Sequence, residues 1–290
     1  MEWYIIALTA AFFSASAAIL EKKILFKEKA LSLSLILALF NLVLVIPFFF
    51  FIEYDLVTSS GLLVLFLKSI LGAFAFLFTM KGMKNLDISK ALPLLVLTPG
   101  LVAIFAFIVL GEPLKLIEIG GMVLLLGGTY ILQLKKKEEI LEPVKESLKP
   151  RGNHYIILTL ILFTITSILD KAILKNYNVP LNAFMAFQHL FFAIIFIFLA
   201  IMYSRNVNLK KSFKFSWKLI STLAVITIIY RYSYLYAVKI APVALVLSIK
   251  RISVFFAVLI GGKLFKDLSL KRRAIATAIM ILGAVLIITA

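Results

Sequence analysis

Two adjacent basic residues lie in the middle of a segment that is otherwise apolar. The segment VALVLSIKRISVFFAVLIG, residues 243–261, is long enough to cross a bilayer, and Lys250 and Arg251 lie near its centre. A cation at the centre of a lipid-facing helix costs about 2.5–3.5 kcal/mol on insertion scales. The pair therefore predicts either internal partners for both charges or a water-filled cavity that receives an anionic substrate.

One carboxylate, Asp170, is expected at the same depth as the three cations Lys250, Arg251 and Arg231. If Asp170 pairs with one of them, the other two positive charges are unmatched. Lys250 could then reach the lipid headgroups along its aliphatic stem, and Arg251 could bond to backbone carbonyls or to Ser248. The alternative is a cavity in which the substrate supplies the missing negative charge.

Two carboxylates occupy matching positions in similar segments, because ILEKKIL and ILDKAIL align Glu21 with Asp170. Glu21 is expected at the inner end of its segment, near Lys81 and Lys84. Lys68, in the outer third of another apolar segment, is expected to extend to the membrane surface. The two carboxylates are predicted either to form structural or gating ion pairs or to take up a coupling ion.

Uncharged polar residues interrupt other apolar runs. Gln188 and His189 lie within FMAFQHLFFA, Asn41 has a comparable place in its own run, and LTPGLVAIF places Thr98 beside Pro99. Proline frees a backbone carbonyl because it lacks an N–H donor. These residues are predicted either to form interhelical hydrogen bonds or to line a substrate cavity.

The composition is that of a membrane protein. The 290 residues are 63% hydrophobic and 16% charged, and a soluble domain of this length cannot bury so much apolar surface. The formal charge of +17 is attributed to cytoplasmic loops rather than to nucleic-acid binding. The chain has no cysteine, and its two histidines lack metal-ligand spacing. No cofactor, no metal site and no enzymatic activity are therefore predicted.

Ten apolar segments are predicted to cross the membrane as helices, which gives an all-α integral membrane protein. They are residues 3–20, 31–52, 61–80, 91–110, 116–134, 154–174, 181–203, 216–236, 243–262 and 274–290. The first and last five form two similar halves, 1–134 and 154–290, joined by a charged linker at 135–153. Five is an odd number, so the second half must enter from the opposite face, as in the inverted repeats of transporters.

Loop charges predict the orientation. The loops after odd-numbered spans contain 22 lysines and arginines, against three in the loops after even-numbered spans. The positive-inside rule then makes the linker cytoplasmic and places both termini outside. The predicted location is the cell (plasma) membrane, namely a prokaryotic inner membrane.

Small residues recur at seven-residue spacing in the fifth and tenth spans. Gly120 and Gly127 form one such pair, and Ala276 and Gly283 form the other. Each pair offers a smooth stripe for close helix contact. The contact is either internal or the interface of a homodimer.

The two-half, ten-span pattern resembles the drug/metabolite transporter superfamily, EamA type. The likeness rests on Pro99, on LGEP at 110–113, on Gly127-Gly128, and on the segments 247–267 and 282–288. It implies a secondary transporter that works by alternating access, with membrane lipids and a small-molecule substrate as its partners.

The stretch IKRISVFF resembles the ninth helix of triose-phosphate translocators. There an adjacent Lys-Arg pair binds substrate phosphate, a role that the resemblance assigns to Lys250 and Arg251. A neighbouring helix of those proteins supplies a substrate-contacting tyrosine, which corresponds to Tyr230, Tyr232 or Tyr234. The chain departs from the pattern at residue 96, where those translocators carry a further phosphate-binding lysine and this chain has valine.

The sequence therefore predicts a transporter of a small anionic metabolite. The alternatives are an EamA-type exporter of amino acids or hydrophobic metabolites, in which the cations anchor a carboxylate or an internal ion pair, and a component of a lipid-linked-sugar flippase.

Overall fold

The computed structural model describes residues 2–85, 95–133, 154–203, 209–260 and 270–290. Every regular element in these ranges is helical. The α-helices are α1 (Trp3–Leu25), α2 (Ala30–Phe49), α3 (Ser59–Asn85), α5 (Thr98–Leu110), α6 (Leu116–Gln133), α8 (His154–Lys175), α9 (Leu181–Met202), α10 (Leu209–Ile240), α11 (Val243–Lys250), α12 (Ser253–Ile260) and α13 (Leu270–Thr289), with a 3-10 turn η1 at Tyr54–Leu56. The predicted linker at 135–153 lies outside the described residues.

Within the described ranges, six helices are long and apolar enough to cross a membrane, namely α1, α2, α3, α8, α9 and α10. Shorter apolar stretches occur at Thr98–Leu110, Leu116–Leu132 and Ile275–Thr289. The all-helical, membrane-spanning class is confirmed, whereas ten spans in two inverted halves stay a prediction.

Two predicted spans have a different form in the structure. The segment 243–262 is not one helix, because α11 ends at Lys250 and α12 begins at Ser253. Within the predicted span 91–110, α5 starts only at Thr98, with Pro99 in its first turn. Proline is favoured there because the first N–H groups of a helix have no intrahelical partner.

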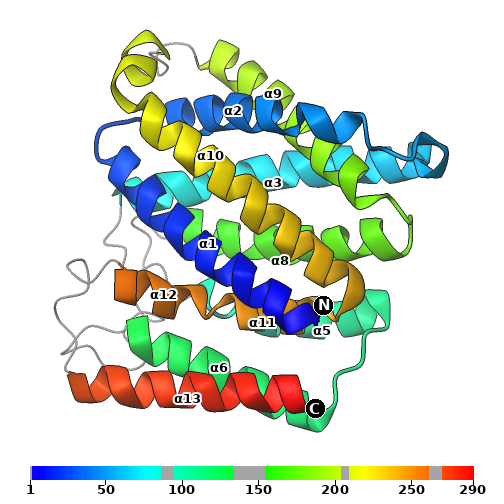
Figure 1. Ribbon diagram of the computed structural model, residues 1–290, viewed down its shortest axis with the longest axis vertical. Coiled ribbons are helices and arrows are strands. Elements are labelled where there is room, and N and C mark those ends of the chain that lie inside the picture. The colour runs from blue at the N-terminus through cyan, green and yellow to red at the C-terminus, as the bar shows by residue number, and fades with distance from the viewer. Residues whose placement is uncertain (1, 86–94, 134–153, 204–208, 261–269) are drawn as a thin grey trace.

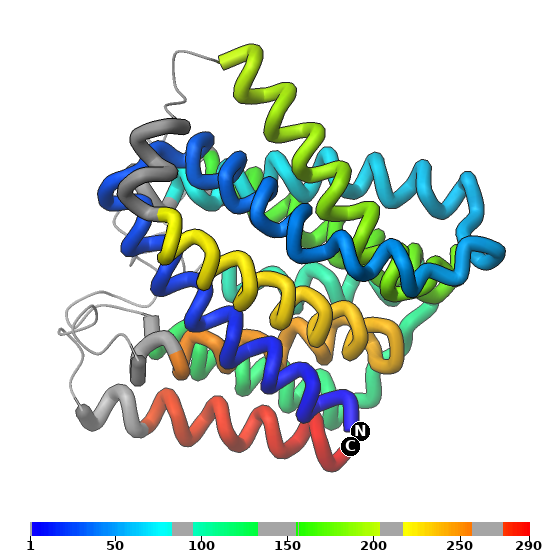
Figure 2. The backbone as a smooth tube through the Cα atoms, turned by 45° about the horizontal axis from the view of Figure 1, so that its top comes forward, coloured from blue at the N-terminus to red at the C-terminus, as the bar shows by residue number. Residues whose placement is uncertain are grey.

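Helices α6 and α13 pack along one edge of the molecule, and α2, α3 and α9 lie at the opposite edge (Figure 1). Between them are α1, α8, α10 and the broken α11–α12. Both views place the chain termini at the same end of the bundle (Figure 2). Lys115 Nζ, in the α5–α6 connection, donates a hydrogen bond to the carbonyl of Ala290 at that end.

Glycine allows α6 and α13 to approach closely, but through different positions from those predicted. A Cβ on Gly121 would lie 2.7 Å from the Gly283 carbonyl oxygen, and one on Gly128 would lie 2.8 Å from that of Ala276. Gly120 and Gly127 have no such neighbour within 4 Å. Ala276 and Gly283 are thus used in an internal contact, and a homodimer through these helices stays a prediction.

Candidate functional site

A cavity of about 260 Å³ lies between α1, α3, α8, α10 and the α11–α12 break, beside the start of α5. Six of its lining residues are ionisable as acids or strong bases: Glu21, Lys68, Asp170, Arg231, Lys250 and Arg251. With all six ionised the lining carries a formal charge of +2. The cavity therefore has an excess of positive charge.

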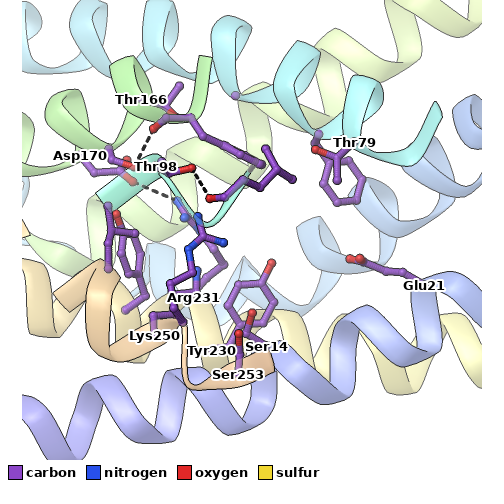
Figure 3. A pocket seen from close by; sticks show the side chains of 18 of the residues that line it. Ser14, Glu21, Thr79, Thr98, Thr166, Asp170, Tyr230, Arg231, Lys250 and Ser253 are labelled. Atoms are coloured by element: carbon purple, nitrogen blue, oxygen red, sulfur yellow. Dashed lines mark hydrogen bonds and ion pairs between the residues drawn. The ribbon is translucent and has the colours of Figure 1, made fainter. Parts of the chain in front are cut away.

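Asp170 is held by two cations (Figure 3). Lys68 Nζ lies 2.6 Å from Asp170 Oδ1, and Arg231 Nη2 lies 3.8 Å from Asp170 Oδ2. Gln188 Oε1 accepts hydrogen bonds from both cations, at 2.7 Å from Arg231 Nη2 and also from Lys68 Nζ. We call Lys68, Asp170, Gln188 and Arg231 the Asp170 network.

The network corrects the prediction for Lys68. This side chain does not extend to the membrane surface: the residue is only 2% exposed, and its ammonium group contacts Asp170. The sequence already indicated this contact. The orientation predicted from the loop charges places both Asp170 and Lys68 toward the outer side of the membrane. Snorkelling requires a clear path to water, and Lys68 has none.

Lys250 and Arg251 line the cavity without an acidic partner. Within the described residues, no carboxylate oxygen lies within 4.0 Å of either side chain. Lys250 Nζ lies over two aromatic rings, 4.5 Å from the centroid of Tyr234 and 5.2 Å from that of Tyr230. Such cation–π contacts offset only part of the cost of a buried charge.

The Arg251 side chain has fewer contacts that offset its charge than Lys250 has. Its Nε is buried and has no hydrogen-bond partner, and Ser248 Oγ donates to the Ala244 carbonyl instead. Within the described residues, the Arg251 side chain therefore has no bond to the Ser248 hydroxyl, and headgroup contact by Lys250 stays a prediction. Arg251 occupies the break between α11 and α12, where its N–H bonds to Ser248 O at 3.0 Å.

Thr98 also lines the cavity, at the start of α5. Its hydroxyl donates to the Leu95 carbonyl at 2.7 Å. That carbonyl is the one left without an N–H donor by Pro99, four residues later. Two helices, α5 and α12, therefore begin at the cavity, where the unpaired N–H groups of helix N-termini favour anions.

Tyr230 and Tyr234 face the cavity from α10. Tyr232, which the resemblance allowed equally, packs instead against Phe48, with ring centroids 5.9 Å apart. The structure thus brings two of the three tyrosines together with Lys250.

Glu21 lies in the same cavity, which the sequence did not predict. In Figure 3 it projects from α1 on the opposite side of the view from Asp170. Glu21 is 8% exposed, and within the part of the chain that the structure describes it forms no hydrogen bond or ion pair. The expected partner Lys81 lies over the rings of Phe78 and Tyr155 instead.

His189 and Asn41 face a different space, a pocket of about 50 Å³ between α2, α9 and α10. Gln188 and Arg231 form part of its wall. Both ring nitrogens of His189, the Asn41 Oδ1 and the hydroxyl of Ser34 are buried there without partners. The pocket has room for a few water molecules. His189 and Asn41, which were predicted as site residues, line this pocket and not the cavity.

A second buried charge cluster lies at the end of the bundle that holds the termini. Glu112 Oε1 lies 3.2 Å from Lys171 Nζ, and its Oε2 accepts a hydrogen bond from Val243 N–H at 3.1 Å. Lys171 donates to the carbonyls of Val238 and Ala241 at 2.7 and 2.8 Å. We call this the Glu112–Lys171 clasp; it joins the α5–α6 connection to α8 and to the α10–α11 turn.

A left-handed residue makes the clasp possible. Gly111 ends α5 with φ 61°, a conformation that glycine adopts without steric cost. The chain then turns inward, so that Glu112 becomes 7% exposed. Among the described residues, no group of three or more histidines, aspartates and glutamates could hold a metal ion.

Comparisons with known proteins agree with this architecture. One solved crystal structure covers 98% of this chain and 96% of its own length, at 18% identity and a TM-score of 0.71. No curated protein matches the chain. A model of the EamA-like transporter family matches residues 1–134.

Residues 1–134 are therefore similar to the EamA-like transporter family, whose members are generally not enzymes. Together with the long apolar helices, this match indicates a multi-pass membrane protein.

Proposed function

We propose that the protein transports a small anionic metabolite, which Lys250 and Arg251 bind by its anionic group. The observation that carries the proposal is the imbalance of the cavity. Asp170 is already held by Lys68 and Arg231, and no carboxylate oxygen of a described residue lies within 4.0 Å of the other two cations. A bound anion would supply the missing charge, and hydrogen bonds between charged groups are about twice as strong as those between neutral ones.

The helix breaks at the cavity support transport by alternating access between two inverted halves, residues 1–134 and 154–290. The loop charges favour an orientation with both termini outside. Transporters of that architecture bind substrate near the midplane, at interrupted helices. Here α5 and α12 both begin at the cavity. An anion bound more tightly in one arrangement of the halves would shift the equilibrium toward that arrangement.

Purified protein in detergent tests the proposal by thermal shift against sulfate, inorganic phosphate, sugar phosphates, carboxylates and amino acids. A ligand at a hundredfold excess over Kd adds about 2.7 kcal/mol of apparent stability. We expect anions to stabilise the wild type, and the Lys250→Met/Arg251→Gln variant to lose this effect. The control is Lys239→Met, because Lys239 is exposed at the end of α10. Equal anion stabilisation in the double variant would refute the proposal.

The second candidate is an exporter of amino acids or hydrophobic metabolites. The contacts of Lys250 with Tyr230 and Tyr234 favour it, because they offset part of the charge without any ligand. Stabilisation by neutral compounds alone, unchanged in the double variant, would support this candidate.

A further inference from the structure

The two matching carboxylates, Glu21 and Asp170, have opposite surroundings. Asp170 is in contact with two cations, whereas Glu21 is 8% exposed and has neither an ion pair nor a hydrogen bond with any other described residue. Both line the same cavity. The sequence left open whether these residues serve as ion pairs or as sites for a coupling ion, and the structure separates them.

We propose that Glu21 is a proton-binding site, and that its proton moves across the membrane together with the anion bound by Lys250 and Arg251. The proposal rests on the proposed function, since it needs an anion in the cavity. A buried carboxylate without partners is costly when ionised and is commonly neutralised by a proton. Glu21 lines the cavity, so a proton can reach it by the same route as the substrate.

The sign of the coupling follows from the charges that face Glu21. From the neighbouring elements these are Lys68 on α3, Asp170 on α8, Arg231 on α10, and Lys250 with Arg251 at the α11–α12 break; Tyr230 and Tyr234 are the other titratable groups. Among the cations, Lys250 interacts electrostatically with Glu21.

An anion bound at Lys250 cancels that positive field and adds negative charge to the cavity, which favours the protonated form of Glu21. By reciprocity, a proton on Glu21 favours anion binding by the same factor. The proton and the anion therefore bind together and travel in the same direction. An exchange mechanism would require the opposite sign.

Sulfate is the probe for this coupling, because it does not itself titrate near neutral pH. Sulfate is added to weakly buffered protein at matched pH and ionic strength, and a pH indicator reports proton uptake. We expect uptake in proportion to the sulfate bound by the wild type, and none in Glu21→Gln, which still binds sulfate. Glu53→Gln is the matched control, since Glu53 is exposed outside the cavity. Sulfate affinity should rise as pH falls in the wild type, and this rise should be lost in Glu21→Gln.

The outcomes separate the two proposals. Sulfate stabilisation of the wild type without proton uptake would overturn the role of Glu21 and leave the anion site intact. Stabilisation by zwitterions alone, lost in Glu21→Gln, would also overturn it, because the substrate would then supply the positive charge. If no anion stabilises the wild type, the anion site and the coupled proton fail together.

Discussion

The Glu112–Lys171 clasp and the Asp170 network use the same residue types but differ in what they leave over. In the clasp both carboxylate oxygens and the ammonium group have partners, and two of these are backbone carbonyls. In the cavity Asp170 is in ion-pair contact with two cations, but Lys250 and Arg251 have no carboxylate oxygen of a described residue within 4.0 Å. In the clasp every charged group has a partner, which predicts a rigid contact. In the cavity two cations have no acidic partner among the described residues, which predicts a ligand.

The difference follows from where each cluster lies in the fold. The clasp fills a turn between helix ends, where backbone carbonyls and N–H groups are free to bond to side chains. Lys68, Asp170 and Arg231 project from helix interiors, where the backbone groups are already paired, whereas Lys250 and Arg251 lie at the α11–α12 break. These side chains must satisfy one another or bind water or a ligand.

The largest expected effect comes from opening the clasp. Glu112→Leu should destabilise the protein by about 3–5 kcal/mol, because it leaves Lys171 charged and buried. The Val243 N–H also loses its acceptor. Unfolding in detergent measures the loss. The double variant Glu112→Leu/Lys171→Met should be more stable than Glu112→Leu alone, since it removes the stranded charge. A double variant as unstable as the sum of both single variants would show that the pair is not coupled.

A smaller loss of stability is expected from Asp170→Asn, which removes the carboxylate that contacts Lys68 and Arg231. Loss of a charged acceptor should cost about 2–3 kcal/mol, less than for the clasp, because the amide still accepts a hydrogen bond and the cavity can admit water. The freed charge of Lys68 and Arg231 should increase the stabilisation by sulfate above that of the wild type. Thermal shift with and without sulfate checks both parts, and weaker sulfate stabilisation would contradict the comparison.

Removing the shared acceptor of the network should cost less again. Gln188→Leu deprives Lys68 and Arg231 of one hydrogen bond each, and interhelical hydrogen bonds in membranes contribute about 0.6 kcal/mol on average. We expect a loss of about 1–2 kcal/mol for the two bonds. Gln188→Glu is the informative partner variant: its added negative charge should keep the stability and reduce the stabilisation by sulfate.

The meeting of Asp170 with Arg231 could be predicted from the sequence, because the rise per residue is fixed. The place of Glu21 in the same cavity could not be predicted, nor could rotation about the helix axes. Lys68 was expected at the membrane surface but is buried, and Gly121 and Gly128, rather than Gly120 and Gly127, contact α13. A helix that is apolar on all sides has no polar stripe to show which face is buried.

The break after Lys250 illustrates the second limit. The segment VALVLSIKRISVFF contains neither proline nor glycine, the two residues with the lowest helix propensity, so its composition does not predict a break at Arg251. The interruption depends on tertiary surroundings, namely the cavity that receives both cations. The start of α5 at Thr98 was more accessible to prediction, because Pro99 cannot continue the hydrogen bonding of a preceding turn.

The smallest expected effect concerns the neighbouring pocket and sharpens the contrast with the cavity. Both ring nitrogens of His189 are buried without partners, so the imidazole already lacks the hydrogen bonds that a polar group needs. Replacing such a group by an apolar one of similar size can be nearly neutral or stabilising. His189→Leu should therefore change stability by less than about 1 kcal/mol and leave sulfate binding unchanged. A loss as large as that of Asp170→Asn, or weaker sulfate binding, would show that water in this pocket links His189 to Arg231 and that the two spaces act as one site.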